Sequence, residues 1–161
     1  MSFNFSNTRN IELSTLKYFD TQLGIDWSDI SIVKSFKKAY SKKVTLPIVA
    51  VILDSGNHPQ KEIGSTALDS SFVITFELFA ESDGMRIDLA AWFINKLRQG
   101  WTYNDYSHTS GDNSQTEGVA DGRISVLEFL TDARFLNPET VEVKDRYRHT
   151  ISVLVNWSGR W

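Results

Sequence analysis

The residue types that most often carry catalysis are few and scattered in this sequence. The three histidines, His58, His108 and His149, lie far apart, and none has the spacing of a helical metal-binding pair. The segment His108–Asp112 holds a His, a Ser and an Asp, but a hydrolase triad needs these groups to converge from rigid elements. Five adjacent residues favour a flexible polar loop instead. The chain has no cysteine, which excludes disulfides, cysteine nucleophiles and thiolate metal sites.

Two carboxylates give a weak indication of metal chemistry. Asp69 precedes a predicted strand and Glu77 lies in its middle, as in some metal-dependent nucleases. Such sites usually add a lysine two residues after the second acid, and here that position is Phe79. Glycine-rich phosphate-binding motifs are also absent from the sequence. We therefore expect no cofactor, no metal and no enzymatic activity, and favour a structural or interaction protein.

Lysines form a cluster between residues 34 and 43. No acidic residue interrupts its five members, and Phe36 and Tyr40 are interleaved with them. The five are Lys34, Lys37, Lys38, Lys42 and Lys43. A nucleic-acid surface has this composition, and so has a solvated strand end or loop. The second interpretation is favoured, because phosphate contact is unexpected for a protein with a pI near 5.6.

Length and composition indicate a single domain over residues 1–161. A chain of 18.3 kDa can bury about two-thirds of its unfolded surface around one core. No apolar run is long enough to span a membrane, and the start does not resemble a secretory signal. Charge is unequal: residues 1–61 carry eight basic and five acidic residues, and residues 62–161 carry nine and fifteen. This asymmetry suits head-to-tail or ring packing, although an accidental distribution is the simpler explanation.

The N-terminal third is expected to contain one helix and one buried strand. Apolar residues fall near one face of Asn10–Leu23, and Gly24 stands where a helix would end. Ile30–Phe36 fits a helix or a strand, with periodicity slightly favouring the helix. Thr45–Leu53 is an almost unbroken apolar run that predicts a strand buried on both faces. Residues 54–57 form a turn-type cluster after it.

The middle of the chain gives the clearest patterns. Phe72–Ala80 alternates between two faces, which predicts a strand. Ser82 offers an N-cap for a helix over Met85–Arg98, and Gly100 offers its end. Asn104–Gly122 is polar and contains three glycines, so we expect a long mobile loop there.

The C-terminal third predicts a long hairpin. Arg123–Leu136 and Val141–Trp157 are strand candidates, and residues 137–140 form the turn between them. A four-residue turn places Glu128 opposite His149, unless a bulge parts them. The expected fold is α+β: a mostly antiparallel sheet with two main helices packed on one face and the hairpin at its C-terminal end.

Four segments, in this order, make the chain resemble the tail terminator proteins of long-tailed bacteriophages, including that of lambda-like phages. They are the short N-terminal helix, the strand Leu46–Val51, the run Glu62–Ser65 followed by the strand Phe72–Ala80 and the next helix, and the late hairpin with Arg146–Val153. The resemblance spans nearly the whole chain. It favours a strand at Ile30–Phe36, against the periodicity.

The resemblance implies a non-enzymatic virion protein made in the host cytoplasm. Tail terminators form hexameric rings on the head-proximal end of the tail tube, stop its growth and provide the surface for joining the head. The implied partners are further copies of the chain, the tail tube protein and a head-completion or connector protein. DNA passes through such a ring without specific binding, and no membrane is involved.

Residues for interfaces are taken from the lysine cluster and the C-terminal cations and tryptophans. The candidates are Lys34, Lys37, Lys38, Lys42, Lys43, Arg146, Arg148, Trp157 and Trp161. Two alternatives stay open. The chain is another neck or head-completion protein, or it is a small nucleic-acid-binding module or nuclease that uses the lysine cluster and the Asp69–Glu77 pair.

Overall fold

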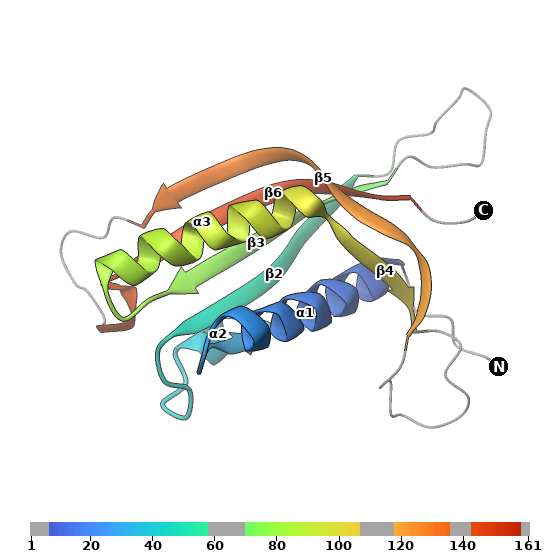
Figure 1. The fold of residues 1–161 in the computed structure, drawn as a ribbon. Coiled ribbons are helices and arrows are strands. Elements are labelled where there is room, and N and C mark those ends of the chain that lie inside the picture. The colour runs from blue at the N-terminus through green and yellow to red at the C-terminus, as the bar shows by residue number, and fades with distance from the viewer. Residues whose placement is uncertain (1–6, 58–69, 107–117, 136–142, 159–161) are drawn as a thin grey trace, which may run out of the picture.

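Two long helices lie on one face of a single mixed sheet (Figure 1). The computed structural model describes residues 7–57, 70–106, 118–135 and 143–158. The elements are α1 (Asn7–Asp26), β1 (Ser31–Val33), α2 (Phe36–Ala39), β2 (Ile48–Asn57), β3 (Ser71–Phe79), α3 (Asp83–Gln99), β4 (Trp101–Asp105), β5 (Val119–Arg134), the 3-10 turn η1 (Val143–Asp145) and β6 (Arg148–Ser158). None of the helices in these ranges is long and apolar enough to cross a membrane.

The sheet has the strand order β1-β2-β3-β6-β5-β4. Only β1 and β2 pair in parallel, and the other four pairs are antiparallel. The expected α+β class, with a mostly antiparallel sheet and two main helices on one face, is therefore confirmed. The predicted C-terminal hairpin is present as the neighbouring strands β5 and β6.

Aromatic side chains fill the core between the helices and the sheet. Phe19 on α1 is fully buried, and its ring centroid lies 5.0 Å from that of Phe76 on β3 and 5.1 Å from that of Phe93 on α3. Trp101 on β4 closes the cluster at 5.4 Å from Phe19. Rings at such separations add attraction to the burial of apolar area. The alternation predicted for Phe72–Ala80 places Phe76 on this face, as expected.

The polar side of α1 is attached to β4 by hydrogen bonds. The amide of Asn10 donates to the Tyr103 hydroxyl (3.1 Å) and accepts from the backbone N–H of Tyr106 (3.3 Å). Ser14 accepts from the backbone N–H of Asn104 (2.9 Å). Buried polar groups are costly unless they are bonded, so these contacts fix where α1 crosses the sheet edge.

The helix α1 is longer than predicted, because Gly24 lies inside it instead of ending it. Its last turn is attached to α3: the carboxylate of Asp26 accepts from the indole N–H of Trp92 (2.9 Å) and pairs with Lys96 (3.2 Å). These tertiary contacts outweigh the low helix propensity of one glycine. The ambiguous segment Ile30–Phe36 contains the strand β1 and then the first residue of α2, so the resemblance was right about the strand.

The predicted turn at residues 54–57 is wrong. These residues continue β2, and Ser55, Gly56 and Asn57 pair with β3 beyond a register shift after Leu53. Asp54 is held by β3, since its carboxylate accepts a hydrogen bond from the Thr75 hydroxyl (2.5 Å). Turn-forming residue types therefore occupy an irregular strand end here, where a bulge accommodates them.

The long structureless loop expected at Asn104–Gly122 is also wrong at both ends. β4 extends through Asp105, and β5 begins at Val119, with Asn104 opposite Ala120. Residues 107–117 lie outside the described residues. The backbone of Gly118 passes so close to Tyr106 that an added Cβ would lie 2.7 Å from its ring, which explains why a strand-flanking position is a glycine.

The hairpin register differs from the prediction. Glu128 lies opposite Leu154, and His149 lies opposite Arg134, because β6 begins only at Arg148 and η1 precedes it. The predicted four-residue turn at 137–140 lies outside the described residues. Two register shifts in β5 change the pairing further, with Leu127 and Leu130 as the extra residues.

Gly84, in the first turn of α3, and Gly100, directly after its last residue, make a matched pair for testing these local requirements. Gly100 has φ of +67°, and an added Cβ would lie 2.6 Å from the carbonyl oxygen of Ile124. We expect Gly100→Ala to lower the free energy of unfolding by at least about 2 kcal/mol, because only glycine adopts this backbone conformation without strain. A Cβ on Gly84 meets nothing within 4 Å. Gly84→Ala should instead raise the free energy of unfolding by about 0.4–1 kcal/mol. Urea denaturation measures both, and equal effects would contradict the expectation.

Candidate functional site

The predicted lysine cluster forms an exposed surface at the β1 end of the sheet. We call residues 34–43, which run from the end of β1 through α2 and the loop after it, the basic segment. All five of its lysines are exposed. Ala39 and Tyr40 of the same segment pack inward against Ile48 and Phe79. The basic segment is therefore anchored by a small apolar cluster while its cations face solvent.

Lys144 holds the backbone of the basic segment in place through three hydrogen bonds. Its ammonium donates to the carbonyl oxygens of Ala39 (2.8 Å), Ser41 (2.9 Å) and Val44 (2.7 Å). An ammonium has three protons, so three acceptors satisfy it completely. Three carbonyls bound to one nitrogen force the chain to turn around Lys144, and this turn presents Lys42 and Lys43.

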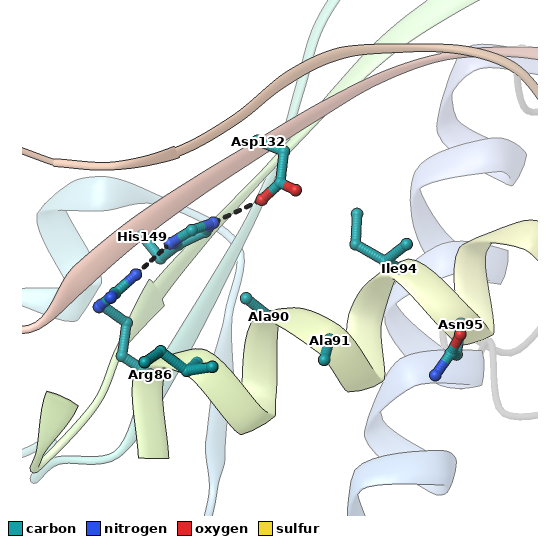
Figure 2. A pocket seen from close by; sticks show the side chains of 8 residues that line it. Arg86, Ala90, Ala91, Ile94, Asn95, Asp132 and His149 are labelled. Atoms are coloured by element: carbon teal, nitrogen blue, oxygen red, sulfur yellow. Dashed lines mark hydrogen bonds and ion pairs between the residues drawn. The ribbon is translucent and has the colours of Figure 1, made fainter. Parts of the chain in front are cut away.

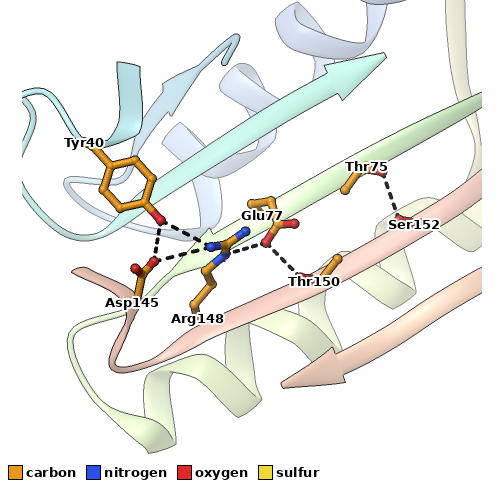
Figure 3. Close-up of polar contacts among 7 residues, drawn as sticks. All are labelled: Tyr40, Thr75, Glu77, Asp145, Arg148, Thr150 and Ser152. Atoms are coloured by element: carbon orange, nitrogen blue, oxygen red, sulfur yellow. Dashed lines mark hydrogen bonds and ion pairs between the residues drawn. The ribbon is translucent and has the colours of Figure 1, made fainter. Parts of the chain in front are cut away.

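A buried ion pair lies next to this anchor (Figure 3). The guanidinium of Arg148 donates to the carboxylate of Glu77 at 2.9 Å, and Thr150 donates to the same oxygen at 2.8 Å. The Tyr40 hydroxyl donates to Asp145 (2.5 Å) and accepts from Arg148 (3.2 Å). These contacts join the residue after α2 to β3, η1 and β6 on the sheet face away from α1 and α3.

The environment of Arg148 keeps it charged. Burial lowers the pKa of Arg148, but the hydrogen bond to Glu77 and the charges of Glu77, Tyr40 and Asp145 outweigh burial and raise the pKa. The guanidinium also lies over the ring of Phe135, 4.1 Å from its centroid. Arg148 was expected at an interface, and the structure instead buries it as a structural cation.

The other interface candidates have different surroundings. Arg146 is exposed on the turn before β6. Trp157 is half-buried, with its ring 4.5 Å from that of Tyr103 and its indole N–H donating to the carbonyl of Asp121 (3.3 Å). Trp161 lies outside the described residues. The structure therefore places the five lysines and Arg146 on the surface and attaches Trp157 to the core.

The carboxylate considered for nuclease chemistry is already engaged. Glu77 is 4% exposed, and its bonded oxygen accepts from both Arg148 and Thr150. Asp69 lies outside the described residues. The described part of the chain holds no group of three His, Asp or Glu side chains arranged for a metal ion. Glu77 thus has a structural role at the centre of the ion-pair network.

A second polar cluster lies in a pocket between α3 and the end of β5 (Figure 2). The cavity has a volume of about 360 Å³ and an apolar wall from α3 that includes Ile87 and Ile94. Arg86 lies 2.8 Å from Nδ1 of His149, and Nε2 of His149 lies 2.6 Å from a carboxylate oxygen of Asp132. Arg86 also donates to Asp83 at 2.8 Å, and that hydrogen bond lowers the pKa of Asp83.

This geometry defines what His149 can do. Arginine only donates, so Nδ1 of His149 must accept, and Nε2 must carry the proton that is donated to Asp132. A general base needs a free acceptor nitrogen facing its substrate. Both nitrogens of His149 are occupied, and its partner Arg86 cannot act as a nucleophile. The chain Arg86–His149–Asp132 therefore joins α3, β6 and β5 without forming a catalytic triad.

Sequence reasoning missed Lys144, Arg86 and Asp132. A detectable signal existed only for Arg86, which follows Asp83 at the helical spacing of an ion pair. His149 was expected beside Glu128 and is bonded to Asp132 instead, because β6 begins only at Arg148, after η1, which places His149 opposite Arg134. His58, His108 and the Ser110–Asp112 part of the triad-like segment lie outside the described residues.

A comparison with models of known protein families gives no match, and neither does one with curated protein sequences.

The buried ion pair gives a direct test of this network. Glu77→Gln keeps the shape of the side chain and removes the charge that compensates Arg148. We expect it to lower the free energy of unfolding by about 3 kcal/mol, because a buried guanidinium loses its main partner. The double variant Glu77→Leu with Arg148→Met should lose clearly less, since it removes both charges. Chemical denaturation measures both, and a Gln variant as stable as the parent would contradict the role of the pair.

Proposed function

We propose that this chain is a phage structural protein of the tail terminator type. It forms a ring on the head-proximal end of the tail tube, stops tube growth and provides the surface to which the head joins. The support begins with the resemblance of its sequence segments to that family. The implied fold class is present, and within Ile30–Phe36, where the resemblance favoured a strand, the structure has β1 at Ser31–Val33.

The observation that carries the proposal is the free edge of β5. β4 pairs only with the first part of β5, from Val119 to Ile124. Residues 125–134 bond to β6 on one side, and no described strand pairs with their other side. The two extra residues of the bulges, Leu127 and Leu130, are 56% and 47% exposed. An edge with unpaired backbone groups and exposed leucines is a surface suited to another chain.

The charges of the sheet support a head-to-tail arrangement. The free edge of β5 carries the exposed acids Glu128 and Asp132, of which Asp132 is bonded to His149, together with the exposed Arg134, and the basic segment lies beyond β1 at the opposite edge of the sheet. Contacts between different surfaces of identical chains generate rings when the rotation closes. Complementary charges guide such contacts and fix their register. We propose that the β5 edge of one protomer faces the β1 side of the next.

Another neck or head-completion protein is the alternative within the same class, and it is distinguished by where the protein lies in the virion. A nuclease is the alternative from another class. Because the Glu77 carboxylate is hydrogen-bonded to Arg148, it has little remaining capacity to bind a metal ion. A magnesium-dependent cleavage assay tests the nuclease alternative directly.

Labelling of the protein in phage particles tests the proposal. Gold-labelled antibody should mark the head-proximal end of isolated tails in electron micrographs, because a terminator stays on the finished tube. Label on filled heads without tails would favour the head-completion alternative. Absence of label from the head-proximal tail end would overturn the proposal.

The same labelling assay, together with light scattering, tests whether the β5 edge is the surface used for association. Leu127→Ser with Leu130→Ser removes two exposed apolar side chains, and we expect reduced association in light scattering and fewer labelled tail ends. Thermal stability should be nearly unchanged because neither side chain is buried. Ile25→Ser is the matched control, since Ile25 is 71% exposed on α1, away from this edge. Normal association of the double variant would exclude the β5 edge as the interface.

A further inference from the structure

The basic segment concentrates positive charge in a way that an acidic protein does not need for solubility. Its five lysines are exposed, and none of them forms an ion pair with a described residue. No acidic residue occurs between Asp29 and Asp54. Asp145, which lies beside the segment, is partly buried and bonded to Tyr40 and Arg148. The segment is therefore a strongly cationic patch on a chain with a net charge of −3.

The patch is also held in one conformation. The ammonium of Lys144 binds three carbonyls of the segment and its continuation, and Tyr40 is bonded to Asp145 and Arg148. A fixed backbone lowers the entropy lost on binding, because only the lysine side chains need to be ordered. Lysine ammonium groups are compact point charges that suit phosphate oxygens. These two properties fit a polyanion with regularly spaced phosphates.

We propose that the basic segment binds the phosphate backbone of a nucleic-acid duplex without reading its sequence. A duplex is favoured over a single strand, because single strands need exposed aromatic rings for base stacking. The aromatic side chain of the segment that the structure describes, Tyr40, is engaged instead, with its hydroxyl bonded and its ring 5.7 Å from that of Phe79 in an edge-to-face contact. The helix α2 has only four residues, too short to read bases in a groove.

This inference stands on the lysines of the free protein and does not require the proposed ring, in which the basic segment faces the β5 edge of the next protomer instead. The two fail separately: duplex binding is measured on purified protein, and the proposed function is measured by the location of the protein on tails. A protein that marks tail ends and does not bind a duplex would overturn only the inference drawn here.

The salt dependence of binding is the test. Fluorescence anisotropy with a labelled DNA duplex and an RNA duplex of the same sequence, between about 50 and 200 mM salt, gives the slope of log K against log salt. Five phosphate contacts predict a slope of about −4.5 per bound protomer, which is a loss of about 500-fold over this range. Lys37→Gln with Lys38→Gln should reduce the slope to about −2.7, and so should Lys42→Gln with Lys43→Gln. Equal slopes on DNA and RNA support backbone recognition.

Controls distinguish the patch from general charge effects. Arg98→Gln removes an exposed cation from α3, and we expect the slope to stay at the parental value. Circular dichroism and light scattering confirm that the lysine variants keep the parental fold and association state. Unchanged slopes in both lysine pairs would overturn the proposal. So would tighter binding to single strands, or equal binding to poly-glutamate, which would indicate an acidic protein partner.

Discussion

The side chain of Phe19 joins α1 to β3, α3 and β4 at one point, and the arrangement of the whole sheet depends on this contact. Its ring lies within 5.4 Å, centroid to centroid, of Phe76, Phe93 and Trp101. Because both long helices meet there, both must lie on the same face of the sheet (Figure 1). The opposite face then has no long helix among the described residues, so its buried charges must compensate one another, as Glu77 and Arg148 do.

This division of the sheet separates two surfaces with different properties. On the face away from the helices, Lys144 holds the backbone after α2, Arg148 holds the Tyr40 side chain, and together they present the basic segment. At the other edge, β4 pairs only with the first part of β5, so the rest of that side of β5 has no neighbouring strand among the described residues. Both surfaces follow from the way in which buried polar groups and strand backbones are paired inside the molecule. The proposed ring needs two such distinct surfaces, because each protomer of a head-to-tail ring contacts its neighbours through different sides.

The sequence was sufficient where one pattern dominates. The alternation at Phe72–Ala80 and the caps Ser82 and Gly100 predicted β3 and α3 nearly to the residue. It was insufficient where the structure departs from local preference: Asp26 extends α1 past Gly24, and β6 begins only at Arg148, after η1, so the β5–β6 pairings differ from those of a four-residue turn. The sequence reveals the five-lysine cluster but not the role of Lys144. The three acceptors of Lys144 lie about a hundred residues away in sequence, and backbone carbonyls leave no sequence signal.

Hydrogen exchange of β5 in the free protein and in the proposed assembly tests the central proposal, that assembly uses the open edge of this strand. Amides of residues 125–134 that are not bonded to β6 should exchange quickly in the free protein and become protected in assemblies on tails, because the neighbouring protomer covers them. Amides of β3 should be equally protected in both states, since β3 is bonded on both sides. Identical exchange of residues 125–134 in the two states would contradict the claim.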